Sequence, residues 1–345
     1  MQTPESQPQL AHNQSYKRKK HSSLPAVVAS LCVLALAVSV FVFRQNIVDT
    51  ITVWRFQPSQ ELTTIVERGK FSELGEFYLY ASEALVVDRA GFNQHCGSLQ
   101  NEKTVVLGCY TLPERRVYVF DVDDTRLDGV KEATAAHEML HAAYDRLSAT
   151  EQARVNTLLR AQEKKITDTR LLELIAFYNQ SEPDAVENEL HSIFGTEVRT
   201  LSPELETYYA QYFTDRAAIV TLKEAYEKVL TDLKAQQQAL VAELNALADS
   251  LSERQTTYKT AIALLDDDIA AFNRWAKSDD ATESEFDARR AVLERRIATL
   301  SAERNSINAA ITTYNTKKAE LDALNVQAES LSQSIDSAMT PPPKL

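Results

Sequence analysis

The C-terminal part of the chain lacks the residues that usually interrupt a helix. No glycine follows Gly195, and no proline lies between Pro203 and Pro341. Glycine and proline are the residues that most often end or kink a helix, so their absence permits long uninterrupted helices. This feature predicts a mainly α-helical chain whose last part is an extended helical module.

Apolar residues in this module recur at steps of three and four. One run covers Leu222–Phe272, a second covers Leu293–Ile335, and a polar segment near 277–284 separates them. Two helices of similar length joined by a short polar loop are typical of an antiparallel coiled-coil hairpin. We predict such a hairpin over residues 216–337. Its charged outer face is either simply solvated or used to bind a protein partner or a second copy of the chain.

The formal net charge of -12 argues against a nucleic-acid partner, because phosphate binding requires a basic surface. Residues 338–345, with three consecutive prolines, are expected to form a disordered tail.

The N-terminal region predicts a membrane anchor. Residues 24–43 are uncharged and dominantly apolar, which matches the roughly 20 residues that a helix needs to cross a bilayer. They follow a polar segment, 1–23, that we expect to be a disordered cytoplasmic tail and that carries the basic cluster Lys17–Lys20. This cluster predicts that the N-terminus stays in the cytoplasm and that the rest of the chain is extracytoplasmic. A cleaved signal peptide, cut near Ala35–Ala37, is the alternative.

Two of the three cysteines, Cys96 and Cys109, lie in the exported part. An even pair in an oxidising compartment predicts a disulfide. The pair His95–Cys96 could instead bind a metal, but no partner stands at zinc-binding spacing.

The sequence His137-Glu138-Met139-Leu140-His141 has the H-E-x-x-H pattern and lies among good helix formers. Residues four apart face the same side of a helix, so His137 and His141 can converge on one metal ion, for which zinc is suited. Glu138 is placed to take a proton from a water held by that metal. The alternative is a buried amphipathic helix whose two histidines are satisfied by hydrogen bonds.

This segment resembles the active-site helix of the zincin metallopeptidases. The resemblance implies an α+β domain, here residues 55–215, with a small antiparallel sheet and helices. It also implies that the strand at the edge of the cleft binds an extended peptide substrate. Arg116–Val122 is our candidate for that strand, and a plain core strand is the equally weighted alternative for these residues. Further predicted strands are Phe77–Tyr80, Leu85–Val87 and Thr104–Leu107.

A catalytic zinc site needs a third protein ligand. By resemblance to the zincins that use glutamate, this ligand comes from a downstream helix, predicted at Asp184–Phe194 and ended by Gly195 in a left-handed cap. Glu189 is our choice, because the small residue Ser192 follows three positions later. Glu187 is the alternative, and because the two side chains point some 200° apart, only one can bind the metal.

A peptidase also needs a donor for the oxyanion of the attacked carbonyl. Spacing singles out none of the available residues, which are Tyr178, His191, Tyr208, Tyr209 and Arg216.

We therefore predict a membrane-anchored zinc metallopeptidase that acts on a peptide or protein outside the cytoplasm. Zinc would be held by His137, His141 and Glu189, with Glu138 as general base. Two alternatives stay open: a non-catalytic envelope scaffold that acts through its coiled coil, and a metal-dependent amidase of cell-wall peptide.

Overall fold

The computed structural model describes residues 1–2, 24–97 and 106–338. The chain divides into two units, Met1–Trp54 and Arg55–Leu345. The described residues are mainly helical, as predicted, with one three-stranded sheet. The predicted tails fall almost wholly outside the described residues.

The first unit contains two helices, α1 (Leu24–Val42) and α2 (Arg44–Arg55). Among the described residues, no single helix is both long and apolar enough to cross a bilayer. Val28–Val42 and Arg44–Arg55 meet the length and composition criteria only as a pair, with a bend of 64° between them.

The second unit contains a mixed sheet. Strands β1 (Leu85–Val87), β3 (Arg116–Phe120) and β2 (Gly108–Thr111) lie side by side in that order. β1 is parallel to β3, with Val86 opposite Val119, and β2 is antiparallel to β3, with Cys109 opposite Tyr118. The prediction of a purely antiparallel sheet was therefore wrong. The order also makes β3 the central strand, so it cannot be the free edge that we predicted would bind a peptide.

Two further strand predictions need correction. Phe77–Tyr80 lies in helix α4 (Glu73–Ala81), where the Ser72 side chain caps the helix by accepting a hydrogen bond from the backbone N–H of Gly75. This capping bond and the packing of Leu79 in the core outweigh the β propensity of the aromatic residues. Of Thr104–Leu107, the first two residues lie outside the described ones, and the last two precede β2 without joining it.

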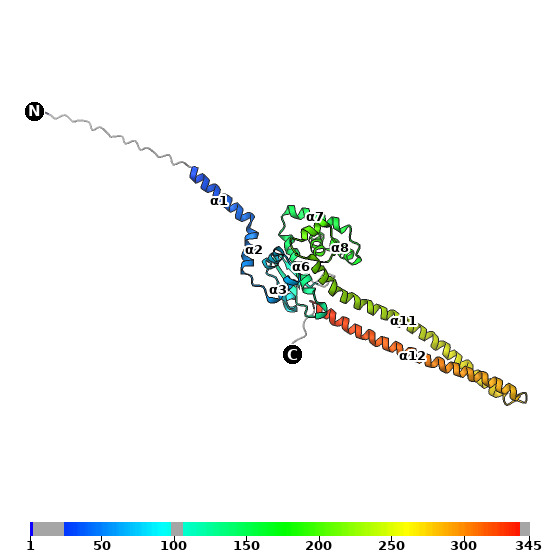
Figure 1. Ribbon diagram of the computed structural model, residues 1–345. Helices are drawn as coiled ribbons and strands as arrows, with labels where there is room; N and C mark the ends of the chain where they lie inside the picture. The colour runs from blue at the N-terminus through cyan, green and yellow to red at the C-terminus, as the bar shows by residue number, and fades with distance from the viewer. Residues whose placement is uncertain (3–23, 98–105, 339–345) are drawn as a thin grey trace, which may run out of the picture. The chain divides into compact units, whose positions relative to one another are not determined.

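Helices α5 (Arg89–Cys96) and α6 (Val130–Asp145) pack on this sheet, and most of the remaining helices of the globular part lie beyond them (Figure 1). Helix α7 (Ala149–Glu163) begins with a capping box formed by Ser148 and Glu151. The other helices of this region, besides α4, are α3 (Gln60–Arg68), α8 (Thr169–Ser181), α9 (Val186–Thr196) and α10 (Pro203–Tyr209).

A disulfide joins Cys96 at the end of α5 to Cys109 in β2. Both cysteines are buried in a core cluster with Phe92 and Phe120. This pairing excludes Cys96 from metal binding, and the His95 ring stacks on Tyr118 with 4.2 Å between the ring centroids.

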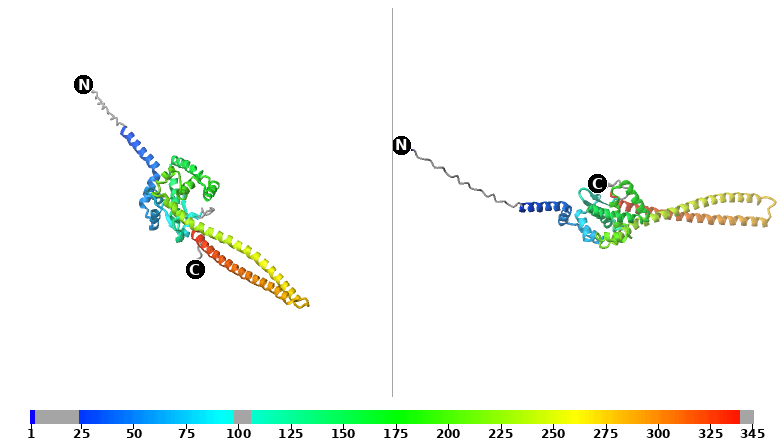
Figure 2. Two further views of the ribbon diagram at one scale, coloured as in Figure 1. Left: turned by 45° about the vertical axis from the view of Figure 1, so that its right-hand side comes forward. Right: turned by 90° about the horizontal axis from the view of Figure 1, so that it is seen from above.

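Two long helices, α11 (Arg216–Trp275) and α12 (Glu283–Ile335), follow the globular part. They run side by side in all the views of Figures 1 and 2. Arg254 pairs with Glu303, while Lys317 pairs with Glu243, nearer the start of α11, so the helices are antiparallel. At 1.5 Å per residue each helix is roughly 80–90 Å long.

The base of this hairpin belongs to the core of the globular part. Tyr226 and Leu233 of α11 and Leu331 of α12 are buried in the same cluster as the disulfide. The end of α12 is fixed by polar contacts as well: the Arg89 side chain donates to the carbonyl of Asp336, with 3.0 Å from Nε to O. The hairpin is thus continuous with the domain that it extends from.

Candidate metal centre

Helix α6 forms the floor of the candidate site. It begins after Gly129, whose φ of +95° lies in the left-handed region, and runs without glycine or proline to Asp145. His137 and His141 lie one turn apart on its open face, with ring centroids 4.8 Å apart. The spacing of four therefore places both imidazoles side by side.

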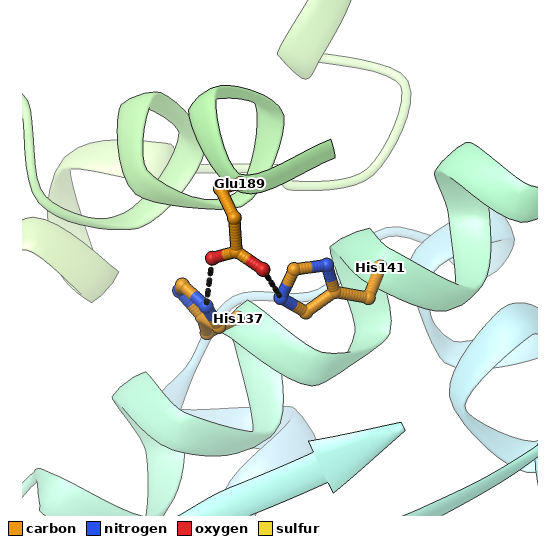
Figure 3. A group of neighbouring side chains, drawn as sticks. All are labelled: His137, His141 and Glu189. Carbon is orange, nitrogen blue, oxygen red and sulfur yellow. Dashed lines mark ion pairs between the residues drawn. The ribbon is translucent and has the colours of Figure 1, made fainter. Parts of the chain in front are cut away.

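Glu189 reaches these two histidines from α9 (Figure 3). Its carboxylate oxygens lie 4.0 Å from Nε2 of His137 and 3.7 Å from Nε2 of His141. The three ligand atoms all lie within 4.8 Å of one another. Around a tetrahedral zinc with bonds of about 2.1 Å, ligand atoms stand roughly 3.4 Å apart, so this group needs only a small contraction to hold the ion.

The rival ligand, Glu187, points elsewhere. Its Oε1 lies 2.6 Å from Nη2 of Arg160 in α7, and the two residues form an ion pair. Glu187 and Glu189 leave α9 in different directions, as the helical spacing requires. Of the two glutamates, only Glu189 joins the histidines.

A glycine in α9 permits this approach, in a way that the sequence did not suggest. Gly195 lies inside α9 instead of ending it in a left-handed cap. A Cβ at this position would lie 2.3 Å from Cδ1 of Leu140 in α6 and 2.9 Å from a ring carbon of Tyr209. Gly195 is thus required for close packing of the two helices that carry the candidate ligands.

Gly108 has the same role between β2 and α6. A Cβ on it would lie 2.6 Å from the methyl group of Thr134 and 2.7 Å from Cγ of Glu138. The strand therefore lies directly against Glu138, which is only 7% exposed. With only 7 glycines in the chain, Gly108 stands out in the sequence, but its packing partner in α6 does not.

These residues line a cavity of about 590 Å³, within the usual range for ligand sites. His137, Glu138, His141 and Glu189 all face it. Residues from β2 and from helices α6, α8, α9 and α11 complete its walls.

Burial shapes the protonation of the group. It lowers the pKa of His137 well below its usual value, and the neighbouring His141 and Lys223 lower it further. His137 is thus neutral near pH 7, the form that binds metals. Burial also raises the pKa of Glu189, against the opposing effects of His141 and of a hydrogen bond from Tyr178. A cation held by these side chains would offset that cost of burial.

The possible oxyanion donors separate into two groups. Tyr178 lines the cavity beside Glu189. The Arg216 side chain instead binds Glu206 and backbone carbonyls. His191 is buried behind the site, and its Nε2 lies 2.9 Å from the Tyr208 hydroxyl, while the Tyr209 hydroxyl donates to the His191 carbonyl. These four residues hold α9 and α10 together and do not line the cavity.

No sequence pattern indicates that the hairpin contributes to the cavity. Lys223 and Tyr226, in the first turns of α11, line the cavity. Lys223 pairs with Glu227 at 2.9 Å and Glu197 at 3.6 Å, and Arg170 of α8 pairs with the same Glu197. This network joins α8, α9 and α11 along one wall.

In comparisons with known proteins, no family model, curated protein or solved structure matches this chain.

Proposed function

We propose that the protein is a membrane-anchored zinc metallopeptidase. The observation that supports this most directly is the meeting of His137, His141 and Glu189 beside Glu138 in one cavity. Two imidazoles and one carboxylate are a ligand set typical of catalytic zinc, which leaves the fourth position to water or substrate. A structural zinc site would instead use four protein ligands, and among the described residues only these three are grouped.

Each side chain has a role that its position favours. Zinc, when bound, supplies a positive charge that acidifies water and polarises a carbonyl. Glu138 accepts the proton of the attacking water and delivers it to the amine that leaves. Tyr178 orients Glu189 by donating its one hydroxyl proton to that carboxylate at the cavity wall. It would donate to the substrate carbonyl only by giving up this bond.

The free edge of β2 favours a peptide as the substrate. The Phe120 N–H donates to the Leu107 carbonyl, and in an antiparallel pair every second residue forms hydrogen bonds with the neighbouring strand. Cys109 and Thr111 therefore direct their backbone groups toward β3. The backbone groups of Gly108 and Tyr110 then point away from β3, and no other strand pairs there among the described residues. An extended peptide can add to this edge above Glu138. Such pairing is less suited to the branched cell-wall peptide of an amidase.

For localisation we propose that residues 24–43, which include α1, anchor the protein with its N-terminus in the cytoplasm, although no single described helix meets the criteria for a span by itself. The basic cluster Lys17–Lys20 precedes an uncharged helix of 19 residues, and the metal centre would then be extracytoplasmic.

Replacement of the general base separates an enzyme from a scaffold. We expect Glu138→Gln to retain zinc but to lose about 10²- to 10⁴-fold in rate, because the water loses its proton acceptor. Zinc content of the purified full-length protein and cleavage of a fluorogenic peptide library are the measurements. Hydrolysis retained in this variant would remove the mechanism, and a folded wild-type protein without zinc would favour the scaffold. Cleavage of cell-wall fragments alone would favour the amidase.

A further inference from the structure

Helix α2 exposes an apolar face. Ile47, Val48, Ile51 and Trp54 are between 41% and 82% exposed, and Trp54 is the most exposed of them. At about 100° per residue these four side chains fall within an arc of roughly 120°. A 12-residue helix with one apolar side turned outward requires something to cover that side.

The charged residues of α2 are divided between the apolar face and the opposite side of the helix. Arg44 and Arg55, at the two ends of the helix, project from the same side as the apolar face. The only acidic residue of the helix, Asp49, lies on the other side, is 4% exposed and accepts a hydrogen bond from Gln45 at 2.8 Å. The exposed face therefore carries positive charge and no negative charge.

The face continues from an apolar helix. α1 contains no charged residue, and its side chains from Val28 on are exposed, including Phe41 at 72%. A single residue, Phe43, separates α1 from α2, and the guanidinium of Arg44 lies over the Phe41 ring at 5.6 Å. If α1 stands along the bilayer normal, a bend of 64° brings α2 closer to the bilayer plane than to the normal.

We propose that α2 is a second membrane-binding element, which lies in the interface of a bilayer that contains anionic lipids. The apolar face enters the boundary between headgroups and acyl chains, with Trp54 at the depth that tryptophan favours. Arg44 and Arg55 bind lipid phosphates at its two ends. This inference rests on the proposed anchoring by α1 and does not depend on the metal chemistry, so either proposal can fail alone.

Tryptophan fluorescence tests the depth of this face directly, because the chain has only two tryptophans. Trp275→Phe in the full-length protein leaves Trp54 as the sole reporter. The protein is reconstituted into vesicles that contain phosphatidylglycerol and lipids brominated on the acyl chain. We expect the emission of Trp54 to be blue-shifted and to be quenched by the bromines. Quenching should be weaker in vesicles of phosphatidylcholine alone, where the arginines have no anionic lipid to bind.

The matched control moves the reporter around the same helix. Asn46 is exposed but lies about 80° from Trp54, outside the apolar arc. With Trp54 and Trp275 both changed to Phe, Asn46→Trp should be quenched by brominated lipid several-fold less and by aqueous iodide several-fold more. Equal quenching at the two positions would overturn the proposal. The proposal would also be overturned if Trp54 were shielded from iodide but not quenched by brominated lipid, because protein would then cover the face. Failure of the protein to enter the vesicles would overturn it as well.

Discussion

At the scale of single residues, the candidate site depends on which glutamate of α9 faces the histidines. The H-E-x-x-H pattern could be read from the sequence because His137 and His141 are neighbours on one helix, and their relation is local. The choice between Glu187 and Glu189 is not local, because it depends on the rotation of α9 against α6. That rotation is set by packing around Gly195, and it leaves Glu187 facing Arg160 on the other side of the helix.

This difference gives a prediction with a control on the same helix. Glu189→Ala removes the proposed third ligand. We therefore expect zinc affinity to fall by more than the factor of about 10 to 100 that is typical of a residue outside the ligand shell. Glu187→Ala also removes one negative charge, but the only interaction that we expect it to break is the ion pair with Arg160. Zinc affinity should therefore stay near the wild-type value. Competition with a chromogenic chelator measures both. Equal losses would mean that charge, not coordination, explains the effect.

At the scale of elements, close packing of α9 and β2 on α6 positions the site. Neither contact could be predicted, since the packing partner of a glycine is distant in sequence. Strand order could not be predicted either. The β-branched and aromatic residues of Arg116–Phe120 indicate a strand, but they do not indicate that it is the central one. A local signal is informative where a cap is present, as at Ser148 before α7. The strand prediction failed where aromatic residues with high β propensity lie in a helix, as in α4.

Gly195→Ala tests the packing of α9 on α6. The new methyl group would overlap Leu140 and Tyr209, and we expect a loss of about 1–3 kcal/mol in the free energy of unfolding, together with weaker zinc binding. Gly97→Ala is the control, because nothing lies within 4 Å of a Cβ there. Leu140→Ala should partly rescue the first variant, and a double-mutant cycle followed by thermal unfolding measures this. A cycle without coupling would contradict the packing role.

The disulfide tests the attachment of β2 to α5. It closes a loop with a sequence separation of 13, so replacing both Cys96 and Cys109 by serine should cost about 2–3 kcal/mol. Cys32→Ser is the control, since Cys32 is exposed and is the free cysteine of the described residues. Denaturant unfolding with and without reductant measures the effect. A wild-type protein insensitive to reductant would show that the bond contributes nothing.

At the scale of the whole molecule, the hairpin is an extension of the globular core and not a separate attachment. Its helical periodicity could be predicted from the sequence, because the apolar residues that form the seam between α11 and α12 recur over many turns. The burial of its base was not, because Leu331 and Tyr226 occupy ordinary seam positions in that repeat.

Two leucines of the hairpin distinguish these roles. Leu331 is 1% exposed in the core cluster, and Leu331→Ala should destabilise the globular part by about 2–5 kcal/mol. Leu264, on the outer part of α11, is 55% exposed, and Leu264→Ala should change stability by about 0.5 kcal/mol or less. Thermal unfolding followed by near-ultraviolet circular dichroism gives the comparison. Similar effects of the two substitutions would mean that the base is no part of the core.

The burial of Leu331, and the bond from the Ser337 hydroxyl to the carbonyl of Val106 at 2.8 Å, have a consequence for biosynthesis. Segments more than two hundred positions apart in the chain must meet before the core closes. When the cavity-lining residues up to Tyr226 have been translated, most of α11 and all of α12 have not. The nascent chain therefore emerges before the residues that complete its core. Any activity of the proposed site would therefore begin only after Leu331 and Ser337 have left the ribosome and joined the core.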